Sequence, residues 1–178
     1  MNNFIQFLTY FRIIAGPIIF ILIVISNFYG LAFILFVLAS LSDYWDGYLA
    51  RKYQLVSMMG EVLDPIADKI LITFVIIALA ISLESSFIAF IGSIILSREF
   101  WVAALRDFNA RNGNINATKV SFIAKLKTAI QLTTLGIYLY GLFLNSALLI
   151  FIADFSLLAT MLITIQTGLT YSIASFKR

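Results

Sequence analysis

Four aspartates form two closely spaced pairs between residues 43 and 68. Asp43 and Asp46 are three residues apart, and Asp64 and Asp68 are four apart. Residues at these spacings share one face of an α-helix. Two carboxylates about 5 Å apart repel by roughly 3 kcal/mol at an effective dielectric near 20. A divalent cation would relieve this repulsion, and Mg²⁺ or Mn²⁺ commonly bridges carboxylates to phosphates.

The composition limits which other side chains could take part in catalysis or metal binding with these carboxylates. The chain has no cysteine and no histidine. Disulfides and thiol catalysis are therefore excluded, together with the usual general base and most zinc sites. Acid–base and metal chemistry must fall to carboxylates, lysine, tyrosine or water.

The elements that carry the aspartates are predicted to be membrane helices. The chain is 62% hydrophobic and 12% charged, whereas a soluble domain has about 25% charged residues. A membrane span needs about 20 mostly apolar residues. We expect one all-α integral membrane domain over residues 1–178, with a polar active-site cavity at the cytoplasmic interface and six transmembrane helices. The expected helices cover about 13–25 (beginning as early as Phe7), 31–49, 62–83, 87–108, 120–143 and 148–173.

The charges indicate how the spans are oriented. With six spans, the lysines and arginines all fall on the side that holds both termini, whereas the opposite turns carry only Glu84. The positive-inside rule then places both termini and the active face in the cytoplasm. We expect polar connectors at 51–60 and 109–118. Gly60 would permit the turn into the third span, and Pro65 would fall in the first turn of that helix.

The aspartate region resembles a known family signature. The CDP-alcohol phosphatidyltransferases carry the pattern D-x2-D-G-x2-A-R-x8-G-x3-D-x3-D, and this chain matches each fixed position. A match across so many fixed positions rarely arises by chance, and the six-span layout extends the resemblance along the chain. The matching residues are Asp43, Asp46, Gly47, Ala50, Arg51, Gly60, Asp64 and Asp68.

The resemblance implies a displacement on a CDP-linked lipid that releases CMP. The four aspartates would bind two Mg²⁺ or Mn²⁺ ions, and Asp68 would bind metal or act as the base toward the acceptor hydroxyl. A metal between the phosphates would stabilise the developing charge. The CDP part of CDP-diacylglycerol would be contacted by Asp43, Asp46, Gly47, Ala50, Arg51 and Gly60.

A second set of residues bears on the acceptor. Arg98 and Arg106 are eight residues apart, about 80° around a helix, and Lys125 opens the fifth span. Three cations at one depth favour a phosphorylated acceptor. The stretches 97–108 and 124–131 are similar to those of the bacterial phosphatidylglycerophosphate synthases, which implies sn-glycerol 3-phosphate. Glu99 is expected to pair with Arg98 or Arg106 rather than to act as a catalyst.

The same resemblance implies a homodimer in the bacterial inner membrane, and no nucleic-acid partner is expected. Leu8, Thr9 and Arg12 echo an L-T-x-x-R run of these enzymes, to which we assign no role. Two alternatives stay open. The acceptor could be inositol phosphate, serine or phosphatidylglycerol, or the aspartates could carry a divalent cation across the bilayer. The three cations could also be topology signals near anionic headgroups.

Overall fold

The computed structural model describes residues 2–53, 58–114 and 122–176, and for residues 2–5, 43, 44, 46–53 and 58–62 it describes the backbone alone. The described residues form six α-helices and no strand, which confirms the all-α prediction. The helices are α1 (Asn2–Val24), α2 (Tyr29–Tyr53), α3 (Met58–Ser82), α4 (Ser86–Arg111), α5 (Phe122–Phe143) and α6 (Ala147–Phe176).

Several helices have the length and apolar character of membrane spans. Within the described residues, four qualify: Gln6–Val24, Leu63–Ser82, Ser86–Arg111 and Ala147–Phe176. The apolar part of α2 is shorter, from Tyr29 to Ser42. Large apolar side chains cover the outside of the bundle, and Phe90 is 67% exposed. Such a surface is suited to lipid rather than to water, so the chain is a membrane protein.

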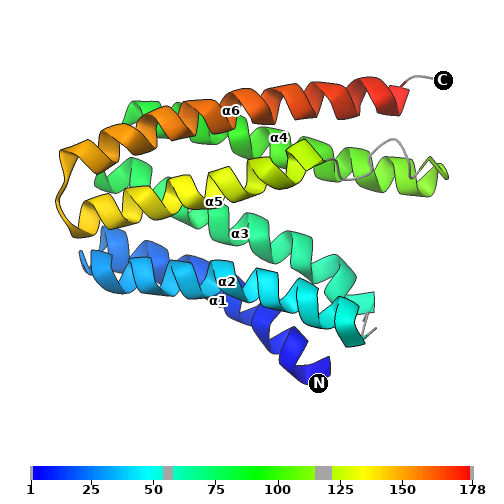
Figure 1. Ribbon diagram of the computed structural model, residues 1–178, viewed down its shortest axis with the longest axis horizontal. Helices are drawn as coiled ribbons and strands as arrows, with labels where there is room; N and C mark the ends of the chain where they lie inside the picture. Colours follow the sequence, from blue (N-terminus) through cyan, green and yellow to red (C-terminus); the bar gives the residue numbers. More distant parts are fainter. Residues whose placement is uncertain (1, 54–57, 115–121, 177–178) are drawn as a thin grey trace.

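The helices run back and forth between two unlike ends (Figure 1). α1 packs along α2 and α3, α4 packs on α3 and α6, and α5 contacts α2, α3 and α6. The three short turns meet at one end of the bundle. Both termini, the ends of α2 and α4, and the starts of α3 and α5 lie at the other end. Small and branched residues such as Ala15, Ile19 and Leu79 fill the core between the helices.

The short turns are built by local sequence. Glu84 and Asn145 adopt left-handed backbone with φ of 47° and 50°. The N–H of the next residue, Ser85 or Ser146, donates to the carbonyl five residues earlier at 3.0 and 2.9 Å. This is the Schellman arrangement that ends helices. The Ser85 hydroxyl then accepts from the Ile88 N–H, which begins α4.

The predicted polar connectors were too long. α2 continues to Tyr53 and α3 already begins at Met58, so Gly60 lies inside α3 rather than in a turn. Pro65 is the eighth residue of α3 and not in its first turn, a loss of one backbone hydrogen bond that membrane helices tolerate. Arginine, lysine and methionine are good helix formers, so the helices extend beyond their apolar parts.

α4 likewise runs to Arg111, beyond the predicted start of the loop at Asn109. Asn109 is buried, and its amide donates to Leu105 O and to Ser175 Oγ, both at 2.7 Å. These bonds hold the end of α4 against α6. A buried partner on another helix thus overrides the turn preference of asparagine.

Candidate active site

The second aspartate pair is held by the first helix. Arg12 donates to Asp68 Oδ1 at 2.5 Å and to Asp64 Oδ1 at 3.2 Å, and the Thr9 hydroxyl donates to Asp64 Oδ1 at 2.6 Å. Arg12 is fully buried, whereas the side chains of Asp64 and Asp68 are 36% and 41% exposed. We call these four residues the carboxylate clamp.

The clamp depends on close packing of α1 against α3. Gly16 lies one turn beyond Arg12 on α1. A Cβ added to Gly16 would come within 3.4 Å of Ile70 O and Leu71 Cα on α3. Gly16 therefore lies against the backbone of α3, one turn from the buried guanidinium.

The clamp leaves one carboxylate oxygen open. All hydrogen bonds and ion pairs of Asp64 involve its Oδ1 atom, so within the described structure Oδ2 has no protein partner. A partly exposed carboxylate oxygen is a hard ligand of the kind that Mg²⁺ or Mn²⁺ takes. This donor chemistry fits a divalent cation at the clamp.

The first aspartate pair lies on α2, for which only the backbone is described around Asp43. Asp68 lines a cavity of about 20 Å³ together with Ala39 and Ser40 of α2. Ser40 is one helical turn before Asp43, so the α2 and α3 pairs are brought to the same region of the bundle. The predicted side-chain contacts that lie outside the described side chains are those of Asp43, Asp46, Ala50 and Arg51, and Gly47 and Gly60 are described only as helical backbone.

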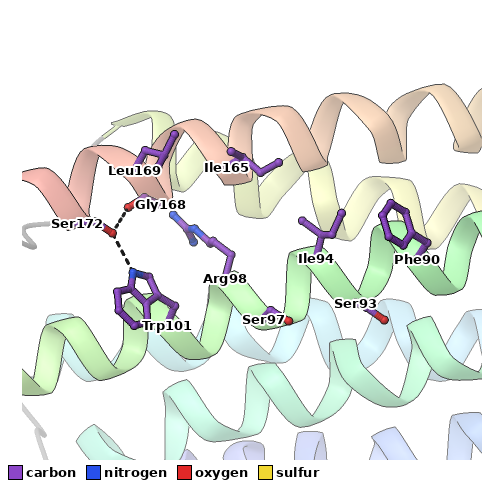
Figure 2. Close-up of a pocket in the computed structure, with 10 residues that line it drawn as sticks. All are labelled: Phe90, Ser93, Ile94, Ser97, Arg98, Trp101, Ile165, Gly168, Leu169 and Ser172. Carbon is purple, nitrogen blue, oxygen red and sulfur yellow. Dashed lines mark hydrogen bonds between the residues drawn. The ribbon is translucent and has the colours of Figure 1, made fainter.

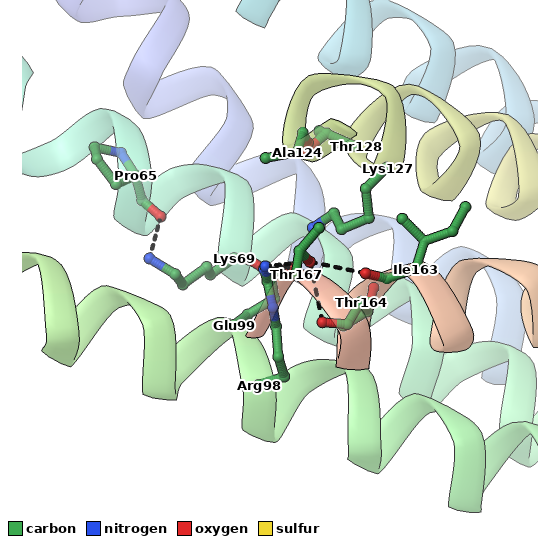
Figure 3. Close-up of polar contacts among 10 residues, drawn as sticks. All are labelled: Pro65, Lys69, Arg98, Glu99, Ala124, Lys127, Thr128, Ile163, Thr164 and Thr167. Carbon is green, nitrogen blue, oxygen red and sulfur yellow. Dashed lines mark hydrogen bonds and ion pairs between the residues drawn. The ribbon is translucent and has the colours of Figure 1, made fainter. Parts of the chain in front are cut away.

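A second polar group forms where α4, α5 and α6 meet (Figure 3). Glu99 of α4 pairs with Arg98 at 3.3 Å and with Lys127 of α5. This confirms the prediction that Glu99 is an ion-pair partner. Arg98 also donates to the Thr167 hydroxyl of α6 at 2.6 Å. The Glu99 carboxylate therefore joins a cation of α4 to a cation of α5, and α6 holds Arg98 through Thr167.

Two further cations, Arg106 and Lys69, lie near this group. The guanidinium carbons of Arg98 and Arg106 lie 5.9 and 6.0 Å from the centre of the Tyr171 ring, at the outer limit for cation–π attraction. Lys69 of α3 donates to Pro65 O of its own helix at 3.2 Å and lies near enough to Glu99, Arg106 and Asp68 for their charges to act on it. We call Lys69, Arg98, Glu99, Arg106 and Lys127 the cation cluster. Lys69 links it to the carboxylate clamp.

We predicted that Lys125 would bind the acceptor phosphate together with Arg98 and Arg106. In the structure, Lys127 faces these arginines and Lys125 does not. The Lys125 side chain is exposed, whereas Lys127 is 4% exposed and bonded to Glu99. Two residues along a helix point about 200° apart, so only one of these lysines can face the cluster.

Several residues of both groups were not predicted from the sequence. Arg12 interrupts an apolar helix, and an isolated cation at such a position signals a buried partner. Gly168 allows Arg98 to lie flat on α6, because an added Cβ would come within 3.0 Å of Arg98 Cγ. Their positions depend on contacts between helices, which the local sequence does not specify. The residues missed in this way are Thr9, Arg12, Lys69, Lys127, Thr167, Gly168 and Tyr171.

A mostly apolar groove of about 560 Å³ runs along the outside of α4 and α6, and Arg98 of the cation cluster is one of its lining residues (Figure 2). Phe90 and Ile94 line it from α4, and Ile165 and Leu169 line it from α6. Across it, Trp101 Nε1 donates to Ser172 Oγ at 2.8 Å. Arg98 is the charged residue of this lining, so the groove borders the cation cluster.

Comparison with known proteins identifies relatives that match most of the chain. A relative from Rickettsia bellii is 40% identical over 180 residues, covering 99% of this chain and 97% of the relative. One from Rickettsia typhi is 43% identical over 144 residues (79% and 78%), and one from Wigglesworthia glossinidia brevipalpis is 35% identical over 173 (96% and 93%). Each is named CDP-diacylglycerol–glycerol-3-phosphate 3-phosphatidyltransferase. The family model for CDP-alcohol phosphatidyltransferase matches residues 3–171, and the chain belongs to this family.

Proposed function

We propose that the chain transfers the phosphatidyl group of CDP-diacylglycerol to sn-glycerol 3-phosphate, giving phosphatidylglycerophosphate and CMP. The relatives named above carry this activity in their names. The observation that carries the proposal is the cation cluster beside Asp68. Arg98 and Lys127 pair with Glu99, and Lys69 and Arg106 lie nearby, so the group has four cations and one carboxylate, an excess of three positive charges (four minus one). A phosphate monoester carries about −1.5 to −2 charges at pH 7, so the cluster suits a phosphorylated acceptor.

The two groups divide the reaction between them. The cation cluster would bind the phosphate of the acceptor, through Arg98, Arg106 and Lys127, with Lys125 as the weaker candidate. Asp68 would take the proton of the acceptor hydroxyl. The hydroxyl oxygen then bonds to the phosphorus that carries diacylglycerol, the bond from that phosphorus to the bridging oxygen breaks, and CMP leaves with the electron pair. Gly47, Ala50, Arg51 and Gly60 would contact the CDP part.

Family members generally depend on a divalent cation. Asp43, Asp46, Asp64 and Asp68 would hold Mg²⁺ or Mn²⁺, as two ions, and the metal would neutralise charge on the diphosphate. The open Oδ2 atom of Asp64 supports this assignment. Asp64 also lies at the start of the Leu63–Ser82 span rather than at its middle. That position favours an interfacial enzyme over a cation transporter.

The same proposal includes one domain of six spans over residues 1–178, in the bacterial inner membrane, as a homodimer. Both termini and the active site would face the cytoplasm. The end of the bundle that holds the clamp and the cluster is also the end of both termini, as Figure 1 shows for the chain ends. Cations gathered on one side favour its retention in the cytoplasm.

The test is CMP release by the purified protein in detergent with CDP-diacylglycerol and Mg²⁺. The acceptors are sn-glycerol 3-phosphate, inositol phosphate, serine and phosphatidylglycerol, each supplied alone. We expect release with sn-glycerol 3-phosphate alone. Release with another acceptor would keep the family chemistry and overturn the acceptor assignment. No release, combined with Mg²⁺ flux in proteoliposomes, would favour the transporter.

A further inference from the structure

Two side chains of α1 contact the carboxylates of α3 from a fully enclosed position. Arg12 is 0% exposed and Thr9 is 1% exposed. Both donate to Asp64 Oδ1, and Arg12 also donates to Asp68 Oδ1. We propose that Thr9 and Arg12 are positioning residues, which fix the orientation of Asp64 and Asp68 for a divalent cation. The inference rests on the metal site of the proposed function.

The hydrogen bonds of the clamp fix the orientation of the Asp64 carboxylate. Thr9 and Arg12 both occupy Oδ1 of Asp64 and leave its Oδ2 without a partner among the described side chains. A carboxylate held by one oxygen cannot rotate freely, so its other oxygen keeps one direction. Outer hydrogen bonds that fix ligand orientation in this way support metal affinity. Exposure of the aspartates on their other side allows access to a ligand.

The clamp is supported by a rigid base. Gly16 permits close contact of α1 with α3, and the core residues Ala15 and Ile19 pack beside it. Positioning groups on packed helices hold their geometry better than groups on loops.

The charge of Arg12 provides a test of this role. A cation beside a metal site opposes metal binding through Coulomb repulsion. If Arg12 acted only by its charge, its removal would tighten metal binding. If Arg12 orients the carboxylates, its replacement weakens binding even when the charge is kept. Thr9 is uncharged, so its replacement reports on orientation alone.

The experiment measures Mn²⁺ binding to the purified full chain in detergent by electron paramagnetic resonance, without substrates. The variants are Thr9→Val, Thr9→Ser, Arg12→Lys and Arg12→Gln. Thr160→Val is the matched control, because Thr160 is also fully buried and its hydroxyl bonds only within α6, to Ser156 O at 2.8 Å. Circular dichroism and thermal melting establish that each variant is folded.

We expect Thr9→Val and Arg12→Lys to weaken Mn²⁺ binding by about 10- to 100-fold, the usual effect of losing an outer-shell partner. Thr9→Ser, which keeps the hydroxyl, and Thr160→Val should bind as the wild type does. The Mg²⁺ concentration for half-maximal CMP release should rise with the Mn²⁺ dissociation constant, while the rate at saturating Mg²⁺ recovers in Thr9→Val.

Wild-type Mn²⁺ affinity in both folded Thr9→Val and folded Arg12→Lys would overturn the inference. Tighter binding in Arg12→Gln, with no change in Thr9→Val, would also overturn it and make Arg12 a competing cation. Asp64→Asn separates these results from failure of the proposed function. If Asp64→Asn weakens binding and the α1 variants do not, only the positioning role fails; if it has no effect, the metal site fails as well.

Discussion

The carboxylate clamp and the cation cluster are opposite solutions to the problem of burying charge. In the clamp, one fully buried arginine is shared by two aspartates whose side chains are partly exposed. In the cluster, one glutamate is shared by Arg98 and Lys127 with two more cations nearby, so positive charge is left over. In each region, one buried or partly buried ion is bonded by two groups of opposite charge, which holds it in place.

This difference fits the proposed reaction, in which the two substrates carry different charged groups. A surplus of carboxylate oxygens suits a metal and its diphosphate, and a surplus of cations suits a phosphate monoester. The two regions meet at adjacent residues of α3, since Asp68 belongs to the clamp and Lys69 to the cluster. In the proposed reaction, the hydroxyl of the acceptor would lie between the two regions. It would then be beside Asp68, the proposed base, while the cation cluster holds the acceptor's phosphate.

The largest effect is expected from replacing Asp68 of the carboxylate clamp. Asp68→Asn should lower CMP release by about 10²- to 10⁴-fold, because an amide cannot accept the acceptor proton as a general base. Binding of CDP-diacylglycerol, measured by equilibrium titration, should change little. Asp107→Asn is the control, since Asp107 is an exposed carboxylate paired with Arg111 at 2.9 Å. Near-normal turnover of Asp68→Asn would show that Asp68 is not the base.

A smaller effect distinguishes the two lysines of α5. Lys127→Met should raise the KM for sn-glycerol 3-phosphate by about 10- to 100-fold, the equivalent of one charge-assisted hydrogen bond. Lys125→Met should change it by less than about twofold, as for an exposed charge. The KM for CDP-diacylglycerol should stay constant in both, as steady-state kinetics would reveal. The reverse order of effects would return Lys125 to the acceptor pocket.

The smallest effect concerns a polar contact outside both regions. The Tyr138 hydroxyl donates to Asp154 at 2.6 Å and ties α5 to α6. Tyr138→Phe should destabilise the protein by about 0.6 kcal/mol, the average for such bonds in a membrane bundle, and leave CMP release unchanged. Denaturant titration in mixed micelles measures the first, and the CMP assay the second. A strong loss of activity would extend the functional region to this end of the bundle.

The helices were largely predictable because their signals are local. Long apolar stretches between polar breaks predicted six helices close to those observed, and residues such as Asn145 and Ser146 indicated the turns. The errors fell at polar helix ends. There, Arg51 and Asn109 were assigned to connectors, although helix propensity and a buried partner on α6 keep them helical.

The sequence by itself determined the family, the membrane class and the two aspartate pairs, because fixed spacings along one chain specify them. Only the tertiary structure decided which residues complete the site. Arg12 is 52 residues from Asp64 and Glu99 is 28 from Lys127, and neither pair has a local signature. Helix packing decides such contacts: the rotation of α5 places Lys127 rather than Lys125 inward, and the close approach of α1 to α3 at Gly16 brings the buried guanidinium to the carboxylates.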